Sequence, residues 1–250
     1  MGIIVKSPRE IDAMRRAGRV VAAILNELVQ RLTPGMATSE LDDITVRELE
    51  RHGATSAFKG YRGYPAYVCV SINDELVHGI PGERVVREGD IVSLDFSASL
   101  DGFYGDAALT VGVGRVSPEA CALIETTKGA LDAGIAAARD GSHLGDVSAA
   151  IQAYAESRGF SVVREYVGHG IGRQMHEEPQ IPNFGIAGRG PLLRRGMTLA
   201  LEPMLNAGGW RTRVADDNWT VSTADGSLSA HFEHTIAITE GEAEILTVVD

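Results

Sequence analysis

The chain has 250 residues, of which 44% are hydrophobic and 23% charged, and a formal net charge of −11. This composition is that of a globular protein, and the length suits one large domain or two small ones. The acidic balance argues against nucleic-acid binding as the main activity, because such binding needs clustered lysine and arginine. Cys69 and Cys121 are the only cysteines, too few for a disulfide framework or a cysteine-rich zinc module.

The sequence contains no run of roughly 20 apolar residues of the kind that spans a bilayer. Its N-terminal segment also lacks the apolar stretch of a secretory signal. We therefore expect a soluble, cytoplasmic protein that does not bind membranes.

Each half of the chain predicts two helices followed by strands. In the first half, an N-cap at Ser7 opens a helix with apolar residues at helical spacing, and a second helix runs from about Thr38 or Ser39 to Gly53. In the second half, Ser117-Pro118 opens a helix, and another follows over about 144–158. The chain thus repeats one order of elements.

Two pairs of segments support an internal repeat. Gly53 and Gly159, which each end a predicted helix, are 106 positions apart, and 87–95 parallels 194–202 at an offset of 107. Both nine-residue segments read as a polar turn, an apolar strand and a terminal carboxylate. We expect pseudo-repeat halves of about 1–115 and 116–250. No low-complexity linker separates them, so we expect one α+β domain over 1–250 with a shared sheet.

A predicted hairpin brings two acidic residues together. Strands over 91–99 and 103–113 flank Asp101-Gly102, a strong turn signal. A two-residue turn places Asp95 and Asp106 on one face, with backbones roughly 7–8 Å apart. Either the two carboxylates bind a cation, or this face is exposed and both meet water.

Three further residues are candidate ligands, each with a plainer alternative. Glu202 follows a buried strand pattern at 198–201 but could be a salt-bridged core residue. Glu233 lies in a strand pattern over 228–238 and could be an exposed alternating position. His169 stands between two glycines, which let backbone pass close to a site, but could be incidental in a glycine-rich turn.

Together these four carboxylates and one imidazole suit two divalent ions, whose charge they balance. Two such ions can activate a bridging water and polarise a carbonyl for hydrolysis. The residue types do not distinguish Co, Mn, Fe and Zn.

The sequence resembles type I methionine aminopeptidases over almost its whole length. The candidate ligands fall in the order and local contexts of that family. The matching segments are GYRGYPAYVC, VSINDELVHGIP, GDIVSLDFSASLDGFYGD, GHGIGRQMHEEPQI, LALEPML and DNWTVSTADGSLSAHFEHT. The resemblance implies the pita-bread fold, in which two pseudo-symmetric helix-helix-strand halves share one curved antiparallel sheet.

The resemblance also implies the roles of the ligands. Asp95 would chelate one metal, His169 and Glu202 the other, and Asp106 and Glu233 would bridge both. A metal-bridged hydroxide would attack the peptide bond after the initiator methionine when the second residue is small. Glu202 would also carry the proton from the attacking hydroxide to the leaving nitrogen.

Further residues are expected at the substrate. His78 and His176 would contact the peptide and stabilise the tetrahedral intermediate, although His78 alone could be a solvated loop residue. The methionine pocket would be formed by Tyr61, Tyr64, Cys69, Met175 and Trp219. Aromatic rings, a thiol and a thioether suit an unbranched thioether side chain, while the two tyrosines could instead be core or surface aromatics. Met175 replaces a frequent Phe and Phe58 a Cys of some relatives, which changes the pocket contour.

The resemblance implies a short bacterial form that acts on the N-termini of nascent polypeptides. We expect a monomer, and the predicted substrate suggests transient association with the ribosome. Two rivals remain at this point. A proline-specific peptidase on the same fold would carry a large N-terminal domain, for which the early helix start leaves no room. A non-catalytic binding module on this fold would tend to lose ligands, yet all five candidates are present.

Overall fold

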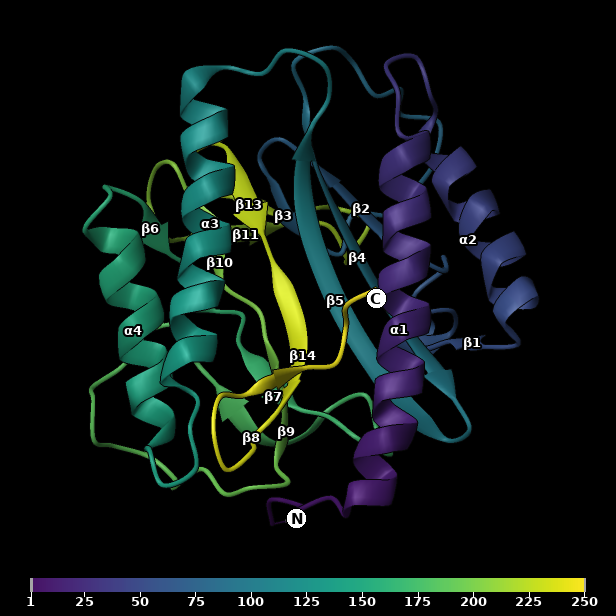
Figure 1. Cartoon of the computed structure of the whole chain (residues 1–250). Coiled ribbons are helices and arrows are strands. Elements are labelled where there is room, and N and C mark those ends of the chain that lie inside the picture. The colour runs from purple at the N-terminus through teal and green to yellow at the C-terminus, as the bar shows by residue number, and fades with distance from the viewer. Residues whose placement is uncertain (1, 250) are drawn as a thin grey trace.

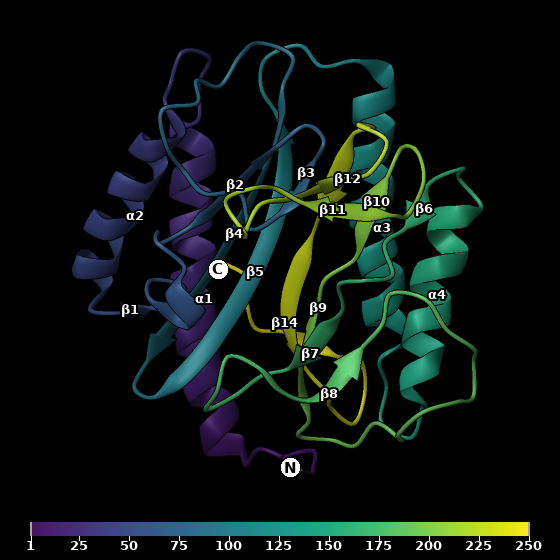
Figure 2. The same cartoon turned by 180° about the vertical axis from the view of Figure 1, so that it is seen from behind.

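Four helices cover one face of a large antiparallel sheet in the computed structural model, which describes residues 2–249 (Figure 1). The helices form two pairs, α1 (Pro8–Arg31) with α2 (Thr38–His52) and α3 (Pro118–Ala137) with α4 (Leu144–Glu156). The first pair lies over the N-terminal strands and the second over the C-terminal ones. The opposite face, seen in Figure 2, is left for loops and smaller sheets.

The large sheet joins strands from both halves of the chain. Its order is β1 (Thr55–Ser56), β4 (Ile91–Leu100), β5 (Phe103–Gly112), β14 (Glu233–Ala237), β9 (Thr198–Leu201), β7 (Gly168–Gly170) and β8 (Glu177–Ile181). Two strands pair at its sides, β2 (Cys69–Ile72) with β4 and β15 (Glu244–Ile245) with β14. Because β5 pairs with β14, the two halves meet at the centre of this sheet.

Two three-stranded sheets complete the fold. One consists of β13 (Ser229–His231), β10 (Met204–Asn206) and β6 (Ser161–Val162). The other consists of β11 (Thr212–Val214), β12 (Val221–Thr223) and β3 (Glu75–Val77), and a short 3₁₀ helix, η1, spans Tyr61–Gly63. The second small sheet also joins the halves, because β3 precedes residue 115 and its partners follow it.

The helices form and pack as their sequences dictate. Ser7 and Glu10 make the predicted capping box at the start of α1, and Gly53 ends α2 with a left-handed φ of 62°. The apolar faces of α1 and α2 pack with Ile24 and Leu41 against the strands beneath, while α3 and α4 build a second core with the C-terminal strands. Each half therefore has its own core on the helical face.

Corresponding positions in the two halves adopt the same local structure. Gly89 and Gly196, which open the paired segments found in the sequence, both have a positive φ, near 90°. Isolated bridges also correspond: Ala37 pairs with Val85 and His143 with Leu192. The exact boundaries of the halves stay a prediction, and the two end residues of the 1–250 range lie outside the described residues.

One predicted strand is wrong in detail. The pattern over 228–238 is a single strand in the sequence, but the structure divides it at Phe232 into β13 and β14. The backbone N–H of Phe232 donates a hydrogen bond to the carbonyl of Pro203. At this residue the chain passes from a small sheet to the large one. Alternation of side chains continues through such a change of partner, so the sequence pattern does not reveal it. Within residues 2–249, the helices are all too short or too polar to cross a bilayer.

Candidate active site

The β4–β5 hairpin places two carboxylates on its buried face. Asp95 lies opposite Ala108 and Ser97 opposite Asp106, the register that a two-residue turn predicts. Asp95 and Asp106 are only 9% and 4% exposed. The alternative of an exposed face, with both acids in water, is therefore wrong.

The second half of the chain contributes the other three candidates. His169 lies in β7, Glu202 directly follows β9, and Glu233 is the first residue of β14. Ligand atoms of Asp106, His169 and Glu233 lie within 4.8 Å of one another. The imidazole Nε2 of His169 is 3.5 Å from a carboxylate oxygen of Glu202 and 3.9 Å from one of Asp106. The central strands thus bring residues more than 100 positions apart to one point.

The imidazole of His169 is oriented by its own backbone. Its Nδ1 lies 2.9 Å from the carbonyl of Gly170, and because a carbonyl only accepts, Nδ1 carries the hydrogen. Nε2 is then unprotonated and faces the carboxylates. Burial, with a smaller contribution from His176, lowers the pKa of His169 to about 3, so the ring is a neutral donor of the kind that metals bind.

Burial of these carboxylates must be offset by protons or by a cation. Burial raises the pKa of Asp95 to about 7, and burial with the neighbouring negative charges raises the pKa of Asp106, Glu202 and Glu233 well above the ordinary range. Asp106 Oδ1 and Glu233 Oε1 have no hydrogen-bond partner among the described residues. Buried oxygens without donors, converging with a neutral imidazole, fit a divalent metal.

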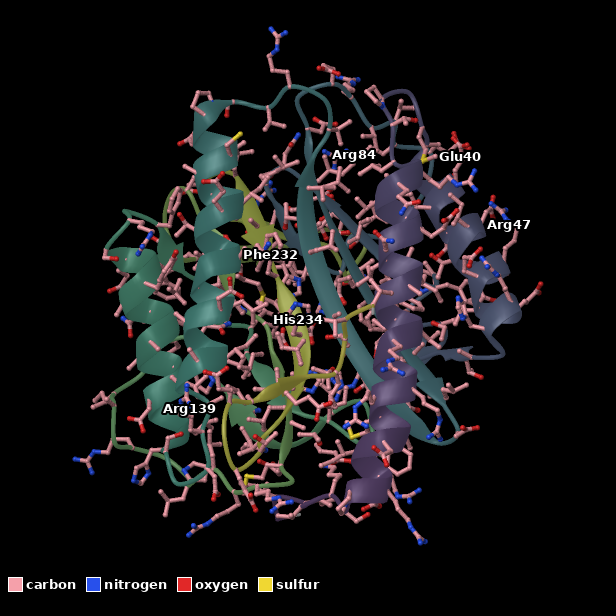
Figure 3. The ribbon with its side chains drawn as sticks, in the orientation of Figure 1. Glu40, Arg47, Arg84, Arg139, Phe232 and His234 are labelled. Carbon is pink, nitrogen blue, oxygen red and sulfur yellow. The ribbon has the colours of Figure 1, made fainter. Side chains whose placement is uncertain are left out.

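A single cavity of about 770 Å³ contains the whole predicted site. Besides the five ligand candidates, it is lined by every residue that was expected at the substrate: Tyr61, Tyr64, Cys69, His78, Met175, His176 and Trp219. Figure 3 shows His234 of β14 on the helical side of the sheet, between α1 and α3. Because successive residues of a strand face opposite sides, Glu233 and the cavity that it lines lie on the other face.

Two histidines border the ligand cluster. The ring of His176 lies 4.1 Å from that of His169 between centroids, and its Nδ1 is 3.2 Å from the hydroxyl of Tyr61. His78 has a φ of 61°, a strained conformation for a side-chain-bearing residue, and packs edge-on against Trp219. Burial, then the charge of His176, lowers the pKa of His78 to about 4, so His78 is neutral near pH 7.

An apolar pocket adjoins the cluster. The Tyr64 ring packs edge-to-face on Trp219 at 5.1 Å and on Phe58 at 6.1 Å, and its hydroxyl donates to the carbonyl of Gly79. Cys69 pairs directly opposite Asp95 between β2 and β4, so the thiol joins the pocket to the carboxylates. Burial raises the pKa of Cys69 well above its usual range, which keeps the thiol neutral. The pocket suits an unbranched apolar side chain.

Several lining residues were not identified from the sequence. Gly2, Ile4, Arg62 and Gln180 border the same cavity. Asn183 donates its side-chain amide to the carbonyl of Glu202 at 2.9 Å. Gly2 and Ile4 precede the first helix and Asn183 lies in a loop, where no periodicity or motif marks them. Arg62 in η1 and Gln180 in β8 lie within matching segments, but no chemical signal separated them from their neighbours.

Buried carboxylates and a neutral imidazole beside an apolar pocket suit a metallopeptidase, and the comparisons with known proteins identify that class. Residues 12–240 match the metallopeptidase family M24. Methionine aminopeptidase 1 of Bacillus subtilis is 52% identical over 99% of this chain and 100% of its own length. A solved methionine aminopeptidase of Thermotoga maritima superposes with a TM-score of 0.97 at 48% identity, covering 99% of this chain and all of that one.

The chain therefore belongs to the metallopeptidase family M24 and, within it, to the methionine aminopeptidases. It is a metal-binding aminopeptidase with the pita-bread fold, as the sequence resemblance implied. A solved Xaa-Pro dipeptidase of Bacillus anthracis shares the fold, with a TM-score of 0.77, but is 23% identical, and this chain covers 61% of it. The proline-specific alternative is not favoured.

Proposed function

We propose that this chain removes the initiator methionine from new polypeptides in the cytoplasm when their second residue is small, using two divalent ions drawn from Co, Mn, Fe or Zn. The observation that carries the proposal is the shared cavity, which joins four buried ligand candidates and the half-buried Glu202 to a soft apolar pocket. A peptide whose first side chain fills that pocket has its first peptide bond beside the carboxylates.

The five ligands divide between two ions in this proposal. Asp95 would help to hold one ion, His169 and Glu202 would help to hold the other, and Asp106 and Glu233 would be shared between them. Four carboxylates balance the charge of two divalent ions, which accounts for the crowding of acids in a buried site. When bound, such a pair lowers the pKa of a water molecule and polarises the scissile carbonyl.

The remaining groups position the substrate and move the proton. Glu202, with 14% of its side chain exposed, is the ligand best placed to take a proton from water and deliver it to the departing nitrogen. His78 and His176 hold the peptide and donate hydrogen bonds to the oxygen that gains charge. Tyr61, Tyr64, Cys69, Met175 and Trp219 hold the methionine side chain.

The partners follow from the reaction. We expect a monomer that meets N-termini as they emerge, with transient ribosome association. Co-sedimentation with ribosomes at physiological salt tests that association, and its absence leaves the enzymatic proposal standing.

Turnover should depend on the shape of the first side chain of the peptide, which enters the apolar pocket. Met-Ala-Ser should be hydrolysed at least about tenfold more efficiently than Leu-Ala-Ser, because a branched side chain does not fit the slot. Norleucine-Ala-Ser is the matched control, since it keeps the shape and lacks sulfur, and it should remain a substrate. Kinetics of kcat/KM on these peptides and on Ala-Pro-Ser check the proposal. Preference for Ala-Pro-Ser would assign the chain to the proline-specific rival.

A further inference from the structure

We propose that Lys6 is a positioning residue of this enzyme, which fixes the loop bearing Met175 and His176 through a buried ion pair with Glu177. The inference rests on the proposed function, because it concerns how that site is held in shape. Lys6 lies ahead of α1, in a segment with no other sequence signal for function.

Both side chains of the ion pair are buried. The ammonium of Lys6 lies 2.6 Å from Glu177 Oε2, and the two side chains are only 3% and 5% exposed. By contrast, the pair of Arg31 with Glu27 on α1 is exposed, with 65% of the arginine side chain open to solvent. A buried ion pair contributes little net stability, since desolvation offsets the attraction. The ion pair is therefore better explained by the conformation that it imposes on the loop than by a gain in stability.

The second oxygen of Glu177 shapes the loop. Oε1 accepts hydrogen bonds from the backbone N–H groups of Arg173 and Gln174, at 2.8 and 3.2 Å. Glu177 thereby closes the turn over 173–177, which contains Met175 and His176. Without the ammonium of Lys6, a buried carboxylate would remain uncompensated in this turn.

The backbone around Lys6 leaves space for this contact. A Cβ on Gly172 would lie 2.5 Å from Lys6 Cε, and a Cβ on Gly196 would lie 2.7 Å from the Lys6 carbonyl. The Lys6 N–H also donates to the carbonyl of Gly196 at 2.7 Å. Lys6 is thus held between the loop after β7 and the turn before β9, the two strands that supply His169 and Glu202.

The loop reaches the reacting centre directly. His176 lies against His169 and within reach of Tyr61, and Met175 is 5% exposed at the pocket. Ile4, two residues before Lys6, lines the same cavity. A shift of this loop displaces His176 from the peptide while leaving the five candidate ligands in place, because these lie in or directly after strands of the large sheet.

The test is a double-mutant cycle on the metal-loaded full chain. Lys6→Met keeps the length of the side chain and removes its charge, and it should lower kcat/KM for Met-Ala-Ser roughly 10- to 100-fold through kcat, with unchanged metal content. In a His176→Ala background the same change should cost less than about twofold, because the residue it positions is gone. Glu177→Gln should follow the same pattern, and Arg31→Met is the matched control for loss of an arbitrary ion pair.

A second readout does not use turnover. In metal-free protein, Lys6→Met should accelerate hydrogen exchange of the Arg173 and Gln174 amides at least about tenfold, while Arg31→Met leaves them unchanged. Equal losses of kcat/KM in both backgrounds, for Lys6→Met and Glu177→Gln alike, would overturn the positioning role, as would native turnover. Absence of metal-dependent turnover in the unmodified chain would instead refute the proposed function.

Discussion

Complete removal of divalent ions should lower kcat/KM for Met-Ala-Ser by about a thousandfold or more, because the metals contribute several kcal/mol to the stabilisation of developing charge. Dialysis against chelator, then re-addition of each ion in turn, is the measurement. The described residues offer no serine or cysteine in the cavity that is paired with a base: Cys69 is neutral and buried. Native turnover in verified metal-free protein would therefore contradict the account.

Removal of the metal ions should also make the free energy of unfolding decrease as pH rises. Folding raises the pKa of Asp95 to about 7 and raises those of Asp106, Glu202 and Glu233 as well, so the metal-free fold holds protons that the unfolded chain has released. That stabilisation is complete below about pH 4 and is lost as pH rises through the folded pKa values.

Calorimetry of metal-free protein at about pH 7 and about pH 8.5 checks this linkage, because the buried histidines, whose pKa values are lowered, contribute their opposite slope below that range. Asp106→Asn is the matched variant: it removes one buried charge with little change of shape, so it should raise the Tm of the metal-free protein at the higher pH. Metal-loaded protein should show the opposite trend, because metal binding requires deprotonated carboxylates. A metal-free Tm that rises with pH and is insensitive to Asp106→Asn would contradict this prediction.

Glu202→Gln should reduce kcat roughly 100- to 10,000-fold, the range expected when a positioned proton carrier is lost. The amide keeps the shape and one oxygen ligand but does not accept a proton. Glu125→Gln on the exposed side of α3 is the control for loss of a carboxylate elsewhere. The measurement is steady-state turnover on Met-Ala-Ser at matched, verified metal content. A kcat within about threefold of the unmodified chain would remove Glu202 from the proton path.

The hairpin shows what local sequence determines. Asp101-Gly102 defines a two-residue turn, the turn defines the register, and the register alone puts Asp95 and Asp106 on one face. The repeat was also visible in the sequence, because matched turns such as those at Gly89 and Gly196 need the same positive φ.

The positions of residues that are far apart in the sequence could not be predicted from local patterns. The convergence of His169, Glu202 and Glu233 depends on the pairing of β14 with both β5 and β9, which no local pattern encodes. The family resemblance supplied that placement. Residues such as Asn183 and Lys6 act through contacts with segments far along the chain, and Lys6 meets a carboxylate 171 positions away. Such contacts become visible only in the fold.

Anomalous diffraction from crystals soaked in excess Mn²⁺ tests the central claim most directly. The account predicts two peaks roughly 3.5–4 Å apart, with Asp106 and Glu233 touching both, Asp95 on one, and His169 and Glu202 on the other. No peak within reach of these five side chains, or a single ion elsewhere in the cavity, would contradict it.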